Sequence, residues 1–152
     1  MLSLTVLSAA FVMGAAIPPP YVCGPVSPPL SWSKVPEGTQ SIAILCDDPD
    51  APSGDWVHWV LFNLPPDTQS LDEGLPRDPV LPNGAVQGIN DYRRNGYDGP
   101  CPPPGSTHRY SFKVYALDTP LKLGPKTRKP DLVKAMEGHI LAQGELTGKF
   151  GR

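Results

Sequence analysis

Basic residues are scarce and dispersed in this chain of 152 residues. Lysine and arginine together number 13, against 15 aspartates and glutamates, so the formal net charge is −2 at neutral pH. Without a basic stripe or an arginine-rich run, the electrostatic basis for binding nucleic acid is missing. The chain also lacks an apolar stretch long enough to cross a bilayer. We therefore expect neither a nucleic-acid partner nor stable membrane association.

Cysteine is also rare. Cys23, Cys46 and Cys101 are the three cysteines, and they form no CxxC pair. An odd count in a chain of this size argues against a disulfide framework, so we expect reduced thiols and a cytoplasmic location. The apolar start, from Met1 to Ala16, resembles a signal peptide, although no lysine or arginine precedes it. A secreted or periplasmic location is therefore the alternative.

Proline and glycine, in contrast, are abundant, at 21 and 15 residues. Apolar runs separate them, so the prolines are typical of turns in a β-rich domain. The length fits one domain over residues 1–152, with no internal repeat or linker. Strand patterns occupy three segments, which are Ser41 to Cys46, Trp56 to Asn63 and His108 to Asp118.

The third of these segments alternates clearly between two faces. His108, Tyr110, Phe112, Val114 and Ala116 share one face of the expected strand. In the second segment, the alternation of side chains along a strand places His58 on the same face as Trp56 and Val60. The Gly- and Pro-rich stretch from Gly96 to Gly105 is either an ordered or a disordered loop, and its place between two apolar segments favours order.

The C-terminal part has the one good helix pattern. Pro130 to Glu137 begins with proline at the first helical position and Asp131 beside the positive end of the helix dipole. From Ile140 the apolar period becomes two, which favours a closing strand, with a continued helix as the alternative.

The chemically informative residues are two histidines on strands and an acidic loop that precedes them in the chain. His58 and His108 lie within apolar strand patterns, and buried imidazoles need hydrogen-bond partners. The nearest acidic loop carries Asp48 and Asp50. If these segments converge, the carboxylates can orient both imidazoles and favour their charged forms. The histidines and the Tyr110 hydroxyl can then donate to an oxyanion.

Three other interpretations of these residues stay open. Both histidines can be ordinary core residues with satisfied nitrogens. Two histidines with Asp48 or Asp50 also resemble a metal-binding facial triad. In the third interpretation, Cys101 is a nucleophile and His108 is its base.

At the level of motifs, the chain resembles the phosphatidylethanolamine-binding protein family, and within it the bacterial and archaeal Raf kinase inhibitor-like branch. The matching segments occur in family order along nearly the whole chain, and they are SPPLSW, DDPDAP, HWVLFNLP, GYDGPCPPPG followed by HRYSFKVYALD, and GHILAQGELTGKF. The resemblance implies a mainly β, antiparallel sandwich-like fold with few short helices. It also implies a pocket for phosphate-type head groups and other small anions.

The resemblance assigns roles in that pocket to nine residues. They are Asp48, Asp50, Trp56, His58, Gly99, Cys101, Pro103, His108 and Tyr110. The two aspartates orient the imidazoles, Trp56 forms a wall and His58 is the inner histidine. His108 and Tyr110 donate to the anion, and the remaining three residues form a rim loop.

Further implications of the resemblance concern the backbone and the function. A cis peptide is expected near Gly54-Asp55, and an opening strand and turn are expected from Ser8 onward, so that the apolar start belongs to the domain. The expected function is binding of a small phosphate- or carboxylate-type ligand, coupled to regulation or inhibition of a partner protein such as a kinase or protease. No cofactor is expected, and a homodimer is possible. The alternative is a hydrolase that uses the Asp/His pocket, with or without a metal.

Overall fold

The architecture was obtained as a computed structural model that describes residues 2–152. In chain order, the elements are β1 (Leu2–Ser3), β2 (Val6–Leu7), the 3-10 helix η1 (Pro19–Tyr21), β3 (Leu30–Trp32), β4 (Ser41–Asp48), β5 (Trp56–Leu64), β6 (Ser70–Leu71), β7 (Val86–Gln87), β8 (Thr107–Leu117), α1 (Lys129–Met136) and β9 (Ile140–Gly151). The predicted mainly β fold is confirmed. The chain from Ile140 onward is a strand, so the alternative of a continued helix is wrong.

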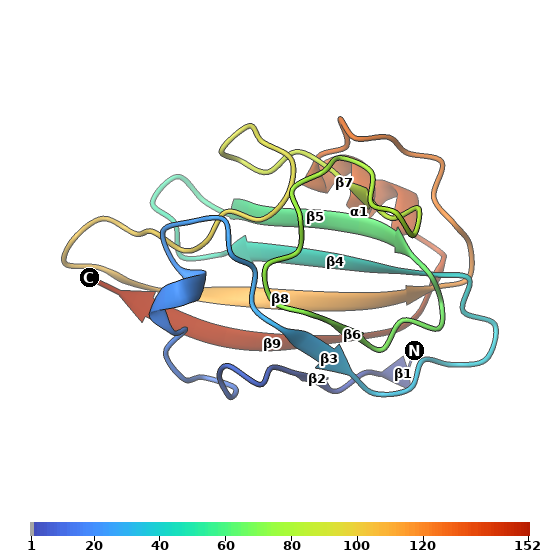
Figure 1. Cartoon of the computed structure of the whole chain (residues 1–152), viewed down its shortest axis with the longest axis horizontal. Helices are drawn as coiled ribbons and strands as arrows, with labels where there is room; N and C mark the ends of the chain where they lie inside the picture. The colour runs from blue at the N-terminus through green and yellow to red at the C-terminus, as the bar shows by residue number, and fades with distance from the viewer. Residues whose placement is uncertain (1) are drawn as a thin grey trace.

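Two sheets form the scaffold. The larger has the order β1-β9-β8-β4-β5-β7, and the smaller has the order β2-β3-β6. All pairs are antiparallel except β1 with β9, which is parallel. In Figure 1 the long strands β5, β4, β8 and β9 lie side by side across the molecule. Three of these four, β4, β5 and β8, lead to the residues that the sequence singles out.

Each face of the larger sheet has its own apolar core. On one face, residues of the small sheet such as Val6, Leu30 and Trp32 pack against Ile44 and Phe112 of the large sheet. On the other face, a second core includes Leu132 and Met136 of α1. Burial of these side chains is the main force that fixes the relative position of the layers. The alternation predicted for β8 is confirmed, because Tyr110, Phe112, Val114 and Ala116 all lie in the first core.

The apolar N-terminal residues contribute to the first core. Leu4, Val6, Phe11 and Ile17 are buried there, as the family resemblance implies for this segment. The first two strands, Leu2–Ser3 and Val6–Leu7, both precede Ser8, however, and the chain from Ser8 to η1 is irregular. Met1, with which the apolar stretch begins, lies outside the described residues. Within residues 2–152, no helix is long and apolar enough to cross a membrane.

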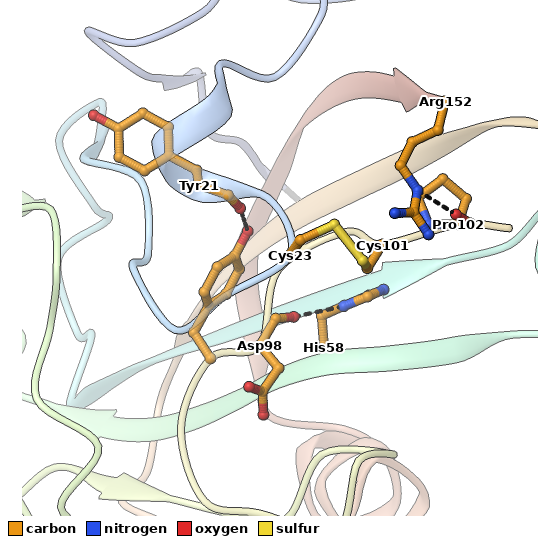
Figure 2. The surroundings of a disulfide bond; sticks show 8 residues. Tyr21, Cys23, His58, Asp98, Cys101, Pro102 and Arg152 are labelled. Carbon is orange, nitrogen blue, oxygen red and sulfur yellow. Dashed lines mark hydrogen bonds between the residues drawn. A yellow bond between two sulfur atoms is a disulfide. The ribbon is translucent and has the colours of Figure 1, made fainter. Parts of the chain in front are cut away.

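A disulfide joins Cys23 to Cys101, so the prediction of three reduced thiols is wrong. Figure 2 shows how it links the segment after η1 to the Gly- and Pro-rich loop. The Cα atoms are 4.7 Å apart although 78 positions separate the two residues. Beside the disulfide, Cys23 N–H donates to the Pro100 carbonyl at 2.8 Å. Cys46 keeps a free thiol, and burial raises its pKa well above the usual value.

We predict that the double substitution Cys23→Ser with Cys101→Ser lowers the free energy of unfolding by about 2–4 kcal/mol, because the cross-link restricts the unfolded chain. Urea denaturation of the oxidised wild type and the double variant measures this difference. A reductant should destabilise the wild type and leave the variant unchanged. Superimposable unfolding curves for the two proteins contradict the prediction.

Candidate functional site

A pocket of about 350 Å³ opens where the ends of three long strands and two loops meet. Strands β4, β5 and β8 supply its acidic, imidazole and phenol groups, while the loops supply mostly apolar walls. The lining residues are Asp48, Ala51, Pro52, Ser53, Trp56, His58, Tyr92, Cys101, Pro102, Pro103, His108 and Tyr110. Seven of the nine predicted site residues therefore lie together. Asp50 and Gly99 do not line the pocket.

His58 is the extra residue of a β-bulge in β5. Val57 pairs with Asp47 and Trp59 pairs with Cys46, so His58 is an extra residue between two neighbouring pairs. Such a bulge shifts the alternation of the strand by one residue. Trp56 and His58 line the pocket, whereas Val60 lies in the second core. The prediction that Val60 shares their face is therefore wrong.

His108 is oriented by the last residue of β4. Its Nδ1 lies 2.6 Å from Asp48 Oδ2, and both side chains are buried. A carboxylate in this position fixes the ring and places the proton on Nδ1. The sequence-based expectation that Asp48 positions an imidazole thus matches the geometry. When the ring carries its second proton, Nε2–H can donate to a ligand.

Asp50 does not orient a histidine; it pairs with Arg109, the residue that follows His108. The Arg109 backbone N–H and side chain both donate to Asp50, with distances of 2.8–2.9 Å. These bonds lower the pKa of Asp50 to about 2. The expectation that Asp50 holds an imidazole is corrected by this pairing. Its observed contacts tie the Asp-Pro loop to the start of β8, which keeps Asp48 beside His108.

The partner of His58 is a backbone carbonyl. His58 Nδ1 lies 2.6 Å from the carbonyl oxygen of Asp98, as Figure 2 shows. His58 is only 2% exposed, and burial lowers its pKa. Its other ring nitrogen, Nε2, is buried and has no hydrogen-bond partner within residues 2–152. The indole Nε1 of Trp56 is likewise buried without a partner there.

Asp98 is a site residue that sequence reasoning missed. Its buried carboxylate accepts hydrogen bonds at 2.8–3.3 Å from the Arg77 and Arg94 guanidinium groups and from the Asn90 amide. These bonds satisfy a charge that is costly to bury unpaired. They also fix the backbone that accepts the His58 proton. The sequence feature that could have indicated Asp98 is that it is the one acidic residue in the Gly- and Pro-rich stretch from Gly96 to Gly105.

The pocket rim follows the same loop. Cys101 and Pro103 line the pocket, whereas Gly99 lines a smaller hollow behind it. A side chain at Gly99 would overlap the Tyr21 carbonyl, so glycine allows the loop to pass close to η1.

The peptide bonds around Gly54-Asp55 are trans, and no cis peptide occurs in residues 2–152, so the expected cis bond is wrong. Gly54 instead adopts a positive φ of 100°.

Two tyrosines complete the pocket. Tyr110 was predicted, while Tyr92, from the turn after β7, was not. The His58 ring lies 5.8 Å from the Tyr92 ring and 5.4 Å from the Tyr110 ring, measured between centroids. Burial raises the pKa of both phenols, and the charge of Asp48 raises that of Tyr110 further. Both hydroxyls therefore keep their protons at neutral pH.

Two of the alternative interpretations meet obstacles in the geometry. Cys101 is disulfide-bonded, so it is not the thiol nucleophile that one interpretation required. In the part of the chain that the structure describes, no group of three or more His, Cys, Asp or Glu side chains is placed to hold a metal ion. The facial-triad interpretation therefore lacks a ligand set here, since Asp50 faces Arg109.

We predict that Asp98→Ala lowers the free energy of unfolding by about 3 kcal/mol, because it leaves buried donors and a cation unpaired. The matched control is Asp118→Ala, which removes an exposed carboxylate paired with His139 and should cost less than about 1 kcal/mol. Denaturant unfolding of both variants measures the difference. Equal, small effects contradict the anchoring role of Asp98.

This chain is similar to a known protein family and to individual proteins of other organisms. Residues 7–151 match the family described as phosphatidylethanolamine-binding protein. A UPF0098 protein of Methanothermobacter thermautotrophicus is 52% identical over 145 residues, which cover 94% of this chain and 95% of that protein. A UPF0098 protein of Aquifex aeolicus is 44% identical, with 98% and 89% covered.

Solved structures agree with this assignment. The crystal structure of a putative phosphatidylethanolamine-binding protein homologue from Chlamydia trachomatis has a TM-score of 0.89 and 39% identity, covering 100% of this chain and 99% of that one. The Escherichia coli protein YbcL, described as a new member of the mammalian family, has a TM-score of 0.92 and 34% identity, with 99% of each chain covered. The resemblance carried by the sequence motifs is thereby confirmed, and the chain belongs to the phosphatidylethanolamine-binding protein family.

Proposed function

We propose that this protein binds a small oxyanion, of the phosphate or phosphoryl head-group type, in the pocket around His58 and His108. The observation that most strongly supports this proposal is the pair of imidazoles in one pocket, each oriented through its Nδ1 atom. Orientation of both rings in advance lowers the entropic cost of binding a ligand. Ordinary core histidines with both ring nitrogens hydrogen-bonded would not need to line one common pocket.

The donors of the pocket fit this proposal. Within residues 2–152, Trp56 Nε1–H is buried without a partner, and the Tyr110 hydroxyl keeps its proton. A protonated His108 ring adds a positive charge next to Asp48. Hydrogen bonds from such groups to an anionic oxygen are stronger than those between neutral groups. We assign His108, Tyr110 and Trp56 as the donors to the anion.

The walls of the pocket suggest the kind of molecule that carries the anion. Apolar and aromatic residues flank the polar base, among them Pro52, Trp56, Pro102 and Pro103. A volume of about 350 Å³ leaves room for an organic group attached to the oxyanion. A phosphate monoester with a short organic group, such as phosphoethanolamine, suits both parts.

We further propose that ligand binding serves regulation or inhibition of a partner protein such as a kinase or protease; this part rests on the family resemblance. Hydrolysis by the Asp/His pocket stays the alternative, because the disulfide removes only Cys101 as a free-thiol nucleophile. The cytoplasmic location and the homodimer stay predictions. The Cys23–Cys101 disulfide is typical of an oxidising compartment, which favours the secreted or periplasmic alternative.

We predict that His108→Ala weakens binding of phosphoethanolamine at least about tenfold, because it removes a charge-assisted donor. Isothermal titration calorimetry on the wild type and the variant measures the ratio, and circular dichroism checks that the variant is folded. His139→Ala, which alters a half-exposed histidine outside the pocket, is the matched control and should bind like the wild type. Unchanged affinity in a folded His108→Ala protein contradicts the proposed role of His108 as a donor to the anion.

A further inference from the structure

The proton on His58 has a fixed position. Its Nδ1 lies 2.6 Å from the Asp98 carbonyl oxygen, and a carbonyl oxygen can only accept a hydrogen bond. Nδ1 must therefore carry the proton. In a neutral imidazole the other nitrogen, Nε2, then holds a lone pair and acts as an acceptor. Figure 2 shows the bond to Asp98 on one side of the ring and Nε2 on the other.

The environment of the ring favours this neutral form. His58 is 2% exposed, and burial disfavours a positive charge on it. The nearest pocket carboxylate, Asp48, is already bound to His108 Nδ1. Within residues 2–152 no donor reaches His58 Nε2, although the atom is fully buried. A buried acceptor without a donor is costly, and a ligand in the pocket is the natural source of that donor.

The other polar groups of the pocket have the opposite character. Trp56 Nε1–H can only donate, and the Tyr110 hydroxyl holds its proton. A protonated His108 also donates through Nε2. The Asp48 carboxylate already accepts from His108, so the pocket presents several donors and, at His58 Nε2, one acceptor that lacks a donor within the described residues. A bare anion can satisfy only the donors. An oxyanion that keeps one hydroxyl can satisfy all of them.

We propose that His58 makes this pocket selective for oxyanions that retain a proton, such as hydrogen phosphate, over oxyanions of similar shape that have none, such as sulfate. This inference rests on the proposed oxyanion binding and names the ligand class more narrowly: a phosphate monoester such as phosphoethanolamine binds as its monoprotonated form, so its affinity should rise as the pH falls towards about 6. In the complex, the P–O–H group donates to His58 Nε2 while the remaining oxygens accept from the donors of the pocket. Sulfate places a lone pair against the lone pair of Nε2, and sites with such an unmet group reject ligands strongly.

Inorganic phosphate and sulfate provide the test. At about pH 7 phosphate retains at least one proton, sulfate retains none, and the two ions are nearly the same size. Sulfate carries at least as much negative charge, so electrostatic attraction alone does not favour phosphate. We expect calorimetric titration of the intact protein at constant ionic strength to give a phosphate affinity at least about tenfold higher than that for sulfate.

Two variants assign the selectivity to His58. His58→Gln places a carboxamide near the position of Nε2, and its NH2 group can donate to sulfate, so the phosphate-to-sulfate ratio should fall towards one. His139→Gln makes the same change at the half-exposed histidine outside the pocket and should keep the wild-type ratio. If His58→Gln does not fold, the wild-type ratio still decides whether the pocket selects a protonated anion.

Each outcome has a distinct meaning. Equal wild-type affinities for the two ions overturn the selectivity and leave the proposed oxyanion binding intact, because they imply that His58 donates to the ligand. A wild-type preference that persists unchanged in folded His58→Gln overturns the role of His58. Failure of both ions to bind the wild type overturns the proposed function itself, and the selectivity with it.

Discussion

The buried carboxylate of Asp98 is the interaction on which the arrangement of the pocket depends. It accepts hydrogen bonds from Arg77 and from Asn90 and Arg94 of its own loop, and these bonds fix its backbone. That backbone carbonyl determines which nitrogen of His58 holds the proton. The chemical character of the inner histidine is therefore set by a residue that does not line the pocket. Charged groups so deeply buried are stable only with several partners, which is why one aspartate can organise a whole loop.

The two histidines illustrate two ways of controlling an imidazole. Asp48 gives His108 a carboxylate partner, which can share the charge of a protonated ring. The Asp98 carbonyl gives His58 a neutral acceptor in a buried place, which favours a neutral ring. The two identical side chains are thus controlled differently: a carboxylate beside His108 can stabilise a second proton, whereas His58 is held as an acceptor. Such a division suits a ligand that carries both negative charge and a hydroxyl group.

Much of the fold and part of the site could be predicted from local patterns. Alternation placed His108 and Tyr110 on the inner face of β8, and the acidic loop pointed to Asp48. The bulge at His58 could not be predicted, because it depends on how β5 pairs with β4. The partner of Asp50 was missed because strand alternation places Arg109 on the face of β8 opposite His108, yet its backbone and side chain both reach the loop. The Cys23–Cys101 bond was excluded by an odd cysteine count, although buried Cys46 is simply the one left over.

The central claim is that the two oriented imidazoles and their neighbouring donors form one oxyanion site. Crystals of the free protein and crystals soaked in phosphate test it most directly. We expect difference density for a tetrahedral anion within hydrogen-bond distance of Nε2 of both His58 and His108. An empty pocket at saturating phosphate, or an anion bound elsewhere on the surface, contradicts the account.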